Sequence, residues 1–184
     1  MNTETFARSR LGKPFVRLMA IVMESRFRYR FFDPIKILQN VDNLPGRAVL
    51  EIGCGTGFFT IPAARLIGDQ GSLVALDVLS ESVELVSKKV QAVNLQNVRV
   101  IKDDALNTGL DTESFDTVIL FGVIPAPMLP LTRLLTEMHR VLKPEGRLAV
   151  WLFPVSGWVP KAILRSGLFT YISKQNGVYN YRRC

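Results

Sequence analysis

The chain is poor in cysteine and histidine, which limits the chemistry that its side chains can offer. Its 184 residues include two cysteines, Cys54 and Cys184, and a single histidine, His139. Two cysteines so far apart give no disulfide framework, so we expect a reducing, cytoplasmic environment. A secretory leader is not expected, because residues 1–4 carry no basic segment and no small-residue cleavage site follows. We also expect no bound metal ion.

The composition excludes a disordered chain. Apolar residues make up 48% of the sequence and charged residues 21%, which is the balance of an ordinary globular protein. A length of 184 residues suits one domain with a full hydrophobic core.

Positive charge is concentrated at the N-terminus. The formal net charge is +7, and residues 1–30 hold seven basic and two acidic side chains, so this segment supplies +5 of it. Its apolar run, Phe15–Met23, is too short to span a bilayer, and cations then alternate with aromatic rings over residues 26–32. Three interpretations stay open: a helix that caps the fold, peripheral membrane contact through residues 8–30, and nucleic-acid contact, which we favour least.

The most informative stretch is a buried strand that runs into a glycine loop and then into a helix. The strand is predicted over Ala48–Ile52, and the helix over Phe58–Ile67. The loop between them is Gly53, Cys54, Gly55, Thr56, Gly57. Glycine at alternate positions lets the backbone bend sharply and lets a ligand lie against bare peptide groups. Amides at the start of the helix favour negative or electron-rich ligand atoms. A tight turn without a ligand is the alternative.

An acid precedes this loop at a characteristic distance. The spacing Glu51-x-Gly53-x-Gly55-x-Gly57 differs from the G-x-G-x-x-G of a dinucleotide site, which disfavours a nicotinamide-dependent oxidoreductase. It resembles motif I of the class I S-adenosylmethionine-dependent methyltransferases. The resemblance implies S-adenosyl-L-methionine as cofactor and S-adenosyl-L-homocysteine as product. It also implies that Glu51 and the glycine loop, with Cys54 and Thr56, hold the methionine end.

Further acids stand at the ends of the next two predicted strands. Asp77, followed by Val78, ends the predicted strand Ser72–Asp77 and lies about 20 residues beyond the last glycine. Nucleotide-binding α/β folds place a carboxylate at this position, where it accepts hydrogen bonds from both ribose hydroxyls. A solvated turn is the alternative for Asp77. Asp103, Asp104 and Ala105 follow the predicted strand over residues 97–102. The resemblance implies an acid here that accepts from the adenine amino group. Asp104 fits by its place before Ala105, Asp103 is the neighbouring alternative, and an Asx turn stays open.

The rest of the chain continues the strand–helix alternation. Strands are predicted over 115–121 and 147–153, a helix over the apolar stripe 131–142, and a hairpin around Asn176-Gly177. The run from Glu137 to Gly146 also resembles small-molecule methyltransferases, including the ubiquinone and menaquinone biosynthesis type. We therefore expect an α/β fold with a doubly wound, seven-stranded, mostly parallel Rossmann-like sheet and a C-terminal β-hairpin. Residues 1–32 are expected to form an arm or lid, and residues 33–184 the methyltransferase domain.

The acceptor site is expected beside the apolar loop 122–130. Backbone after Phe121 would close the methionine side, and the candidate acceptor-binding residues are Tyr29, Ile124 and Pro125. An apolar loop facing a basic, aromatic arm indicates a small, apolar or lipid-like acceptor. We assign no catalytic base, and we interpret His139 as a residue that holds its helix to neighbouring elements. An RNA or protein methyltransferase, or a non-catalytic cofactor-binding relative, is the alternative. The Asn/Asp-Pro-Pro-aromatic motif of amino-group methylation is missing after Phe121.

Overall fold

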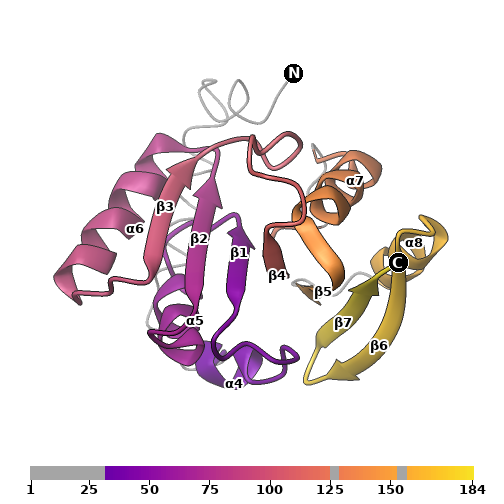
Figure 1. Ribbon diagram of the computed structural model, residues 1–184, viewed down its shortest axis with the longest axis horizontal. Helices are drawn as coiled ribbons and strands as arrows, with labels where there is room; N and C mark the ends of the chain where they lie inside the picture. Colours follow the sequence, from indigo (N-terminus) through magenta and orange to yellow (C-terminus); the bar gives the residue numbers. More distant parts are fainter. Residues whose placement is uncertain (1–31, 125–128, 153–156) are drawn as a thin grey trace.

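One seven-stranded sheet runs through the molecule, with the strand order β3-β2-β1-β4-β5-β7-β6 (Figure 1). The computed structural model describes residues 32–124, 129–152 and 157–184. The five strands that come first in the sequence pair in parallel, whereas β7 runs antiparallel to both of its neighbours. The strands are β1 (Ala48–Ile52), β2 (Ser72–Asp77), β3 (Val98–Lys102), β4 (Phe115–Phe121), β5 (Leu142–Trp151), β6 (Phe169–Gln175) and β7 (Val178–Arg183). The expected fold class is confirmed.

Helices cover both faces of this sheet. They are α4 (Pro34–Leu38), α5 (Thr60–Ile67), α6 (Ser80–Ala92), α7 (Leu131–Val141) and α8 (Val159–Arg165). Successive residues of a strand point to opposite faces, so Val49 packs with α4 and α5 while Leu50 packs with α7 and α8. α6 lies on the same face as α5, where Val86 and Val90 pack against Ala75 of β2. Burial on both faces explains why the parallel strands are continuous apolar runs.

Residues that commonly cap helices stand at the start of α4 and of α6, and only the first of them forms a cap. Asp33 caps α4, because its Oδ1 accepts from the amides of Ile35 at 2.9 Å and Lys36 at 3.3 Å. Serine is a common N-cap residue and Ser80 precedes an acidic, apolar-periodic run, which would predict a cap there, but Ser80 is the first residue of α6 and makes no side-chain cap. The Asp77 carboxylate instead accepts from the Leu79 amide at 3.0 Å, so the end of β2 already satisfies this turn.

Two further boundaries follow from pairing between strands. β5 begins at Leu142, five residues before the predicted Arg147, because Leu142 pairs with Phe115 ahead of a register shift in β4. The hairpin is confirmed: Asn176 and Gly177 join β6 to β7 with positive φ angles of 45° and 82°. Positive φ at both central residues is what a two-residue hairpin turn of this hand requires.

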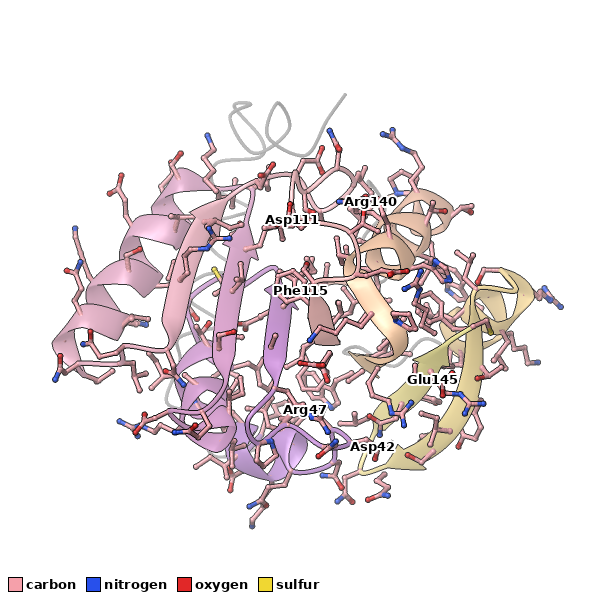
Figure 2. All side chains as sticks on the ribbon, viewed as in Figure 1. Asp42, Arg47, Asp111, Phe115, Arg140 and Glu145 are labelled. Atoms are coloured by element: carbon pink, nitrogen blue, oxygen red, sulfur yellow. The ribbon has the colours of Figure 1, made fainter. Side chains whose placement is uncertain are left out.

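A buried carboxylate on α7 fixes the loop that follows β3. Glu137 Oε1 accepts from both the amide and the hydroxyl of Thr108, each at 2.8 Å. Arg140 donates to both oxygens of the same carboxylate, at 2.9 and 2.7 Å. These hydrogen bonds, with that from Arg140 the largest cause, lower the pKa of Glu137 to about 2. Figure 2 shows Arg140 at the same edge of the molecule as Asp111, which belongs to this loop.

We expect Glu137→Gln to lower the free energy of unfolding by ~2 kcal/mol at pH 7, since the charge-assisted bonds to Thr108 and Arg140 are weakened. Because its pKa is lowered by folding, the Glu137 contribution is complete above pH 4.5 and is lost as the pH falls toward about 2. Urea unfolding at pH 7 and pH 3 measures both effects. Glu145→Gln is the control, because Glu145 meets Arg182 at the exposed surface. Equal losses in the two variants would contradict the assignment.

Candidate functional site

The glycine loop turns tightly over the end of β2. The amides of Gly53 and Cys54 both donate to the carbonyl of Leu76, at 2.8 and 3.0 Å. Gly53, Gly55 and Gly57 all have positive φ, at 73°, 53° and 80°. A Cβ on Gly53 would come within 2.7 Å of a Val123 methyl group, whereas a Cβ on Gly55 would meet only a backbone oxygen at 3.9 Å. Gly53 is therefore required by packing, but the space beside Gly55 is left open by the protein.

Asp77 joins this loop to the end of β2. Its side chain is 8% exposed, so the alternative of a solvated turn residue does not apply. Oδ2 accepts from the Gly55 amide at 2.9 Å, and Oδ1 accepts from the Leu79 amide at 3.0 Å. Burial raises the pKa of Asp77, although the backbone hydrogen bonds act in the opposite direction. The bond between Asp77 and Gly55 was not foreseen from the sequence.

Glu51 is a second buried acid, one residue before the end of β1. It is 3% exposed, and its Oε2 accepts from the hydroxyl of Thr60 at 2.7 Å. Burial raises the pKa of Glu51 to about 7, the Thr60 bond lowers it, and the charge of Asp77 raises it. Thr60 was missed by the sequence analysis, although a polar residue at the start of an otherwise apolar helix was a usable signal.

A pocket of about 130 Å³ lies between the loop and the ends of β2 and β3. Six of the predicted site residues line it: Gly53, Asp77, Val78, Asp103, Asp104 and Ala105. The four further lining residues are Ile52, Leu76, Val123 and Leu129, of which the last two belong to the loop 122–130 expected beside the acceptor site. All four are apolar, so the pocket combines apolar walls with a group of carboxylates.

Asp103 and Asp104 both reach this pocket, and their geometries differ. Asp104 Oδ1 accepts from the Leu106 amide at 2.9 Å, so the Asx turn considered for this residue does form. Asp103 Oδ1 accepts from the Asp104 amide at 2.8 Å, and the Asp103 amide donates to the Asp77 carbonyl at 3.1 Å. In the described part of the chain, no residue donates to the Oδ2 atom of either side chain. Each of these two acids therefore has one oxygen that makes no hydrogen bond to a described residue.

Other predicted site residues lie beside the pocket or outside the described chain. Cys54 is buried against Ala75 and α6, and burial raises the pKa of its thiol. The Thr56 carbonyl accepts from Lys89 of α6 at 2.8 Å. The remaining predicted residues fall into two groups. Phe121 and Ile124 are buried in the hydrophobic core, on opposite faces of the sheet. Tyr29, Pro125 and residues 8–30 lie outside the described residues.

His139 does not line the pocket. Its Nε2 lies 3.1 Å from the carbonyl oxygen of Cys184, and its ring meets Phe169 edge-on at 5.9 Å between centroids. Both contacts connect α7 to the C-terminal hairpin, as the sequence interpretation of this residue proposed.

We expect Glu51→Gln to stabilise the ligand-free protein above pH 7. The pKa of Glu51 is raised from 4.5 to about 7, so the folded state binds more protons than the unfolded state between these values, and stability falls as the pH rises through this window. Over this window the wild-type protein should lose on the order of 3 kcal/mol of its free energy of unfolding. Urea unfolding at pH 5, 6, 7 and 8 compares the two proteins. Glu81→Gln, at an exposed position of α6, is the control. The same pH slope in wild type and Glu51→Gln would sink the assignment.

Comparisons with known proteins agree with this geometry. A family model for a methyltransferase domain matches residues 49–146, more than half of the chain. The demethylmenaquinone methyltransferase of Lactobacillus johnsonii is 30% identical over 135 residues, which are 72% of this chain and 52% of that protein. The one from Bacillus cereus is 33% identical over 108 residues, 58% of this chain and 45% of that protein. The chain thus spans about half the length of the curated relatives it matches.

The solved structures give the same answer for the fold. A SAM dependent methyltransferase from Aquifex aeolicus superposes with a TM-score of 0.77 at 24% sequence identity, covering 89% of this chain and 96% of that one. The matched family region includes the glycine loop, both buried acids and the strand ends around the pocket. This chain belongs to the class I S-adenosylmethionine-dependent methyltransferase family.

Proposed function

We propose that this protein transfers a methyl group from S-adenosyl-L-methionine to a small, apolar or lipid-like acceptor. The observation that carries the proposal is the glycine loop, folded against a pocket whose carboxylates come from the ends of neighbouring parallel strands. Ligands of open α/β sheets bind at this edge, outside the carboxyl ends of the strands.

The residues present fit this cofactor. A side chain at position 55 would fill the open space beside the loop. Because Gly55 has none, a ligand can lie directly on the peptide backbone there. The apolar walls, including Leu76 and Leu129, suit a flat purine ring. Buried and partly buried carboxylates suit a ligand with a sulfonium and an ammonium charge.

Each acid then has a proposed role. Asp77 would accept from the ribose hydroxyls, because each carboxylate oxygen accepts more than one hydrogen bond and only one per oxygen is used by Gly55 and Leu79. Asp104, with Asp103 as the alternative, would accept from the adenine amino group through its Oδ2 atom. Glu51 and the glycine loop would hold the methionine end, with the backbone after Phe121 closing that side.

The bound cofactor supplies an already activated methyl group. The protein therefore has to hold the acceptor in line with that group and keep water away, which is work for an apolar pocket. In the described lining the ionisable side chains are the three aspartates, with no histidine, lysine or tyrosine. This lining favours an acceptor that reacts without a protein base.

The acceptor class rests on two supports. The curated relatives are named demethylmenaquinone methyltransferases. The part of the pocket wall that comes from loop 122–130 is apolar, since it consists of Val123 and Leu129. We infer an acceptor of the same kind, a ring with a lipid tail, contacted by Tyr29 and Pro125; Ile124, the third candidate, is 3% exposed, so we propose that it supports the apolar wall from the core. We propose that residues 33–184 bind the cofactor and that residues 1–32 form a separate arm that controls acceptor binding. Within this arm, residues 8–30 are proposed to make a peripheral membrane contact.

We expect Gly55→Val to abolish cofactor binding, since the added Cβ meets only the Gly53 carbonyl oxygen, at 3.9 Å, and otherwise enters the ligand space. Valine at a φ of 53° is strained, so both this variant and its control should lose some stability but stay folded. Titration calorimetry with S-adenosylmethionine, S-adenosylhomocysteine and NAD measures the loss. Gly46→Val is the matched control: Gly46 has a similar φ of 72°, also has free space around it, and lies at the other end of β1. Binding to Gly55→Val at wild-type affinity would refute the cofactor position.

The acceptor is tested with labelled S-adenosylmethionine and three substrates: short-chain demethylmenaquinone in detergent, total RNA, and total protein. We expect label in the quinone alone, with cofactor affinity retained but transfer lost after deletion of residues 1–23. Label in RNA or protein supports those alternatives instead. Tight cofactor binding without transfer to any substrate indicates a non-catalytic relative.

A further inference from the structure

The C-terminal segment 157–184 is basic and forms the outer edge of the sheet. It contains Lys161, Arg165, Lys174, Arg182 and Arg183 and no aspartate or glutamate. β6 is the last strand of the sheet, and α8 packs beside it (Figure 1).

The outward face of α8 mixes cations with apolar side chains. Val159 and Ile163 are completely buried and hold the helix to the core. At 100° per residue, the opposite side of the helix carries Lys161, Leu164 and Arg165, with Trp158 just ahead of its first turn. Trp158 is 55% and Leu164 is 44% exposed. This outward face differs from that of the usual surface helix, which is polar throughout, because large apolar side chains stand among its cations.

β6 adds to the same side of the molecule. Tyr171 pairs with Tyr181, which belongs to the core cluster that includes α8, and their rings meet at 6.1 Å. Lys174 lies over the ring of Tyr179, which packs against the same cluster, at 4.7 Å. Tyr171 and Lys174 therefore share the sheet face on which α8 lies. We name this surface the α8–β6 face: Trp158, Lys161, Leu164, Arg165, Tyr171 and Lys174.

The charges of this face are available to a partner. Arg182 and Arg183 are paired with Glu145 and Glu113, but none of the three cations of the α8–β6 face forms an ion pair with a described carboxylate. Exposed large hydrophobic side chains gather in the same segment. Among the described residues they are Ile35, Val93, Trp158, Leu164, Tyr171 and Ile172. Four of these six belong to residues 157–184.

We propose that the α8–β6 face binds the surface of an anionic lipid bilayer. Lysine and arginine next to exposed tryptophan, tyrosine and leucine are the side chains that suit a charged membrane interface, where rings and aliphatic groups enter the headgroup region and cations meet phosphates. None of the residues of this face lines the cofactor pocket, so the proposal does not depend on the proposed acceptor.

Two other occupants fit the face less well. A second copy of the chain would bring three more cations against the same three, and Lys174 on an edge strand opposes strand-to-strand pairing. Single-stranded nucleic acid stacks its bases on aromatic rings, but Leu164 has no flat surface to offer, and it stands between the cations of α8. Charge and aliphatic exposure together favour lipid.

The two tryptophans of the chain make the contact directly measurable. Trp151 is 6% exposed and Trp158 is 55% exposed, so a change in polarity around the tryptophans on binding reports on Trp158. Full-length protein is mixed with vesicles of phosphatidylglycerol and phosphatidylcholine in equal parts, or of phosphatidylcholine alone. We expect a blue shift of the emission and protection from acrylamide with the anionic vesicles only. Trp158→Phe should show neither change. Sedimentation with the vesicles and no change in Trp158 emission would overturn the proposal, because another segment then makes the contact.

Charge reversal gives the second test. Lys161→Glu/Arg165→Glu should weaken vesicle partitioning at least ~25-fold at low salt, about fivefold for each cation removed. Lys88→Glu/Arg99→Glu changes the same net charge at exposed positions of α6 and β3, and it should retain most of the partitioning. Equal losses in both double variants overturn the proposal, as does wild-type protein that binds a single-stranded RNA oligonucleotide but not anionic vesicles.

Discussion

The hydrogen bond from the Gly55 amide to the Asp77 carboxylate is the contact on which the site depends. It connects the loop after β1 to the end of β2 across 22 positions of sequence. The same carboxylate caps the turn into α6 through Leu79, so one buried side chain fixes two backbone segments. Its removal would leave two partly buried amides without their partner, each a loss of about 1 kcal/mol. For this reason Asp77 is both a structural residue and the proposed ribose ligand, and Gly55 gives the cleaner test of binding.

The carboxylates also set the electrostatics of the pocket. Glu51 and Asp77 are buried close enough for the charge of one to raise the pKa of the other. Asp103 and Asp104 add two acids to this region, while the nearby Lys89 donates to a loop carbonyl. A cationic ligand reduces the electrostatic repulsion between these acids and stabilises the ionised form of Glu51. The positive charge of the cofactor thus favours the ionised carboxylate that burial disfavours.

Most of the fold, and most of the residues that line the pocket, could be predicted from the sequence, for a physical reason. Parallel strands buried on both faces must be continuous apolar runs, and glycines at alternate positions mark where the chain reverses against β2. The sequence did not reveal contacts between distant segments. Ser80 looks like a helix cap until Asp77 is known to satisfy the Leu79 amide. Loop 122–130 was expected beside the site, but the close approach of Val123 to Gly53, where a Cβ would come within 2.7 Å of its methyl group, was not. Thr60 matters only through the buried oxygen of Glu51.

The order of the strands separates the two proposed functional surfaces. β3 and β6 are the opposite edges of the sheet, so the acids around the pocket and the cations of the α8–β6 face are held apart by the strands between them. Had the cations stood beside Asp77 and Glu51, they would have lowered the pKa values of these acids and competed with a cationic cofactor. Had the acids stood on the outer face, they would have repelled an anionic bilayer. The uneven charge of this chain is therefore compatible with binding a cation at the carboxyl ends of β1, β2 and β3 and an anionic surface beside the edge strand β6.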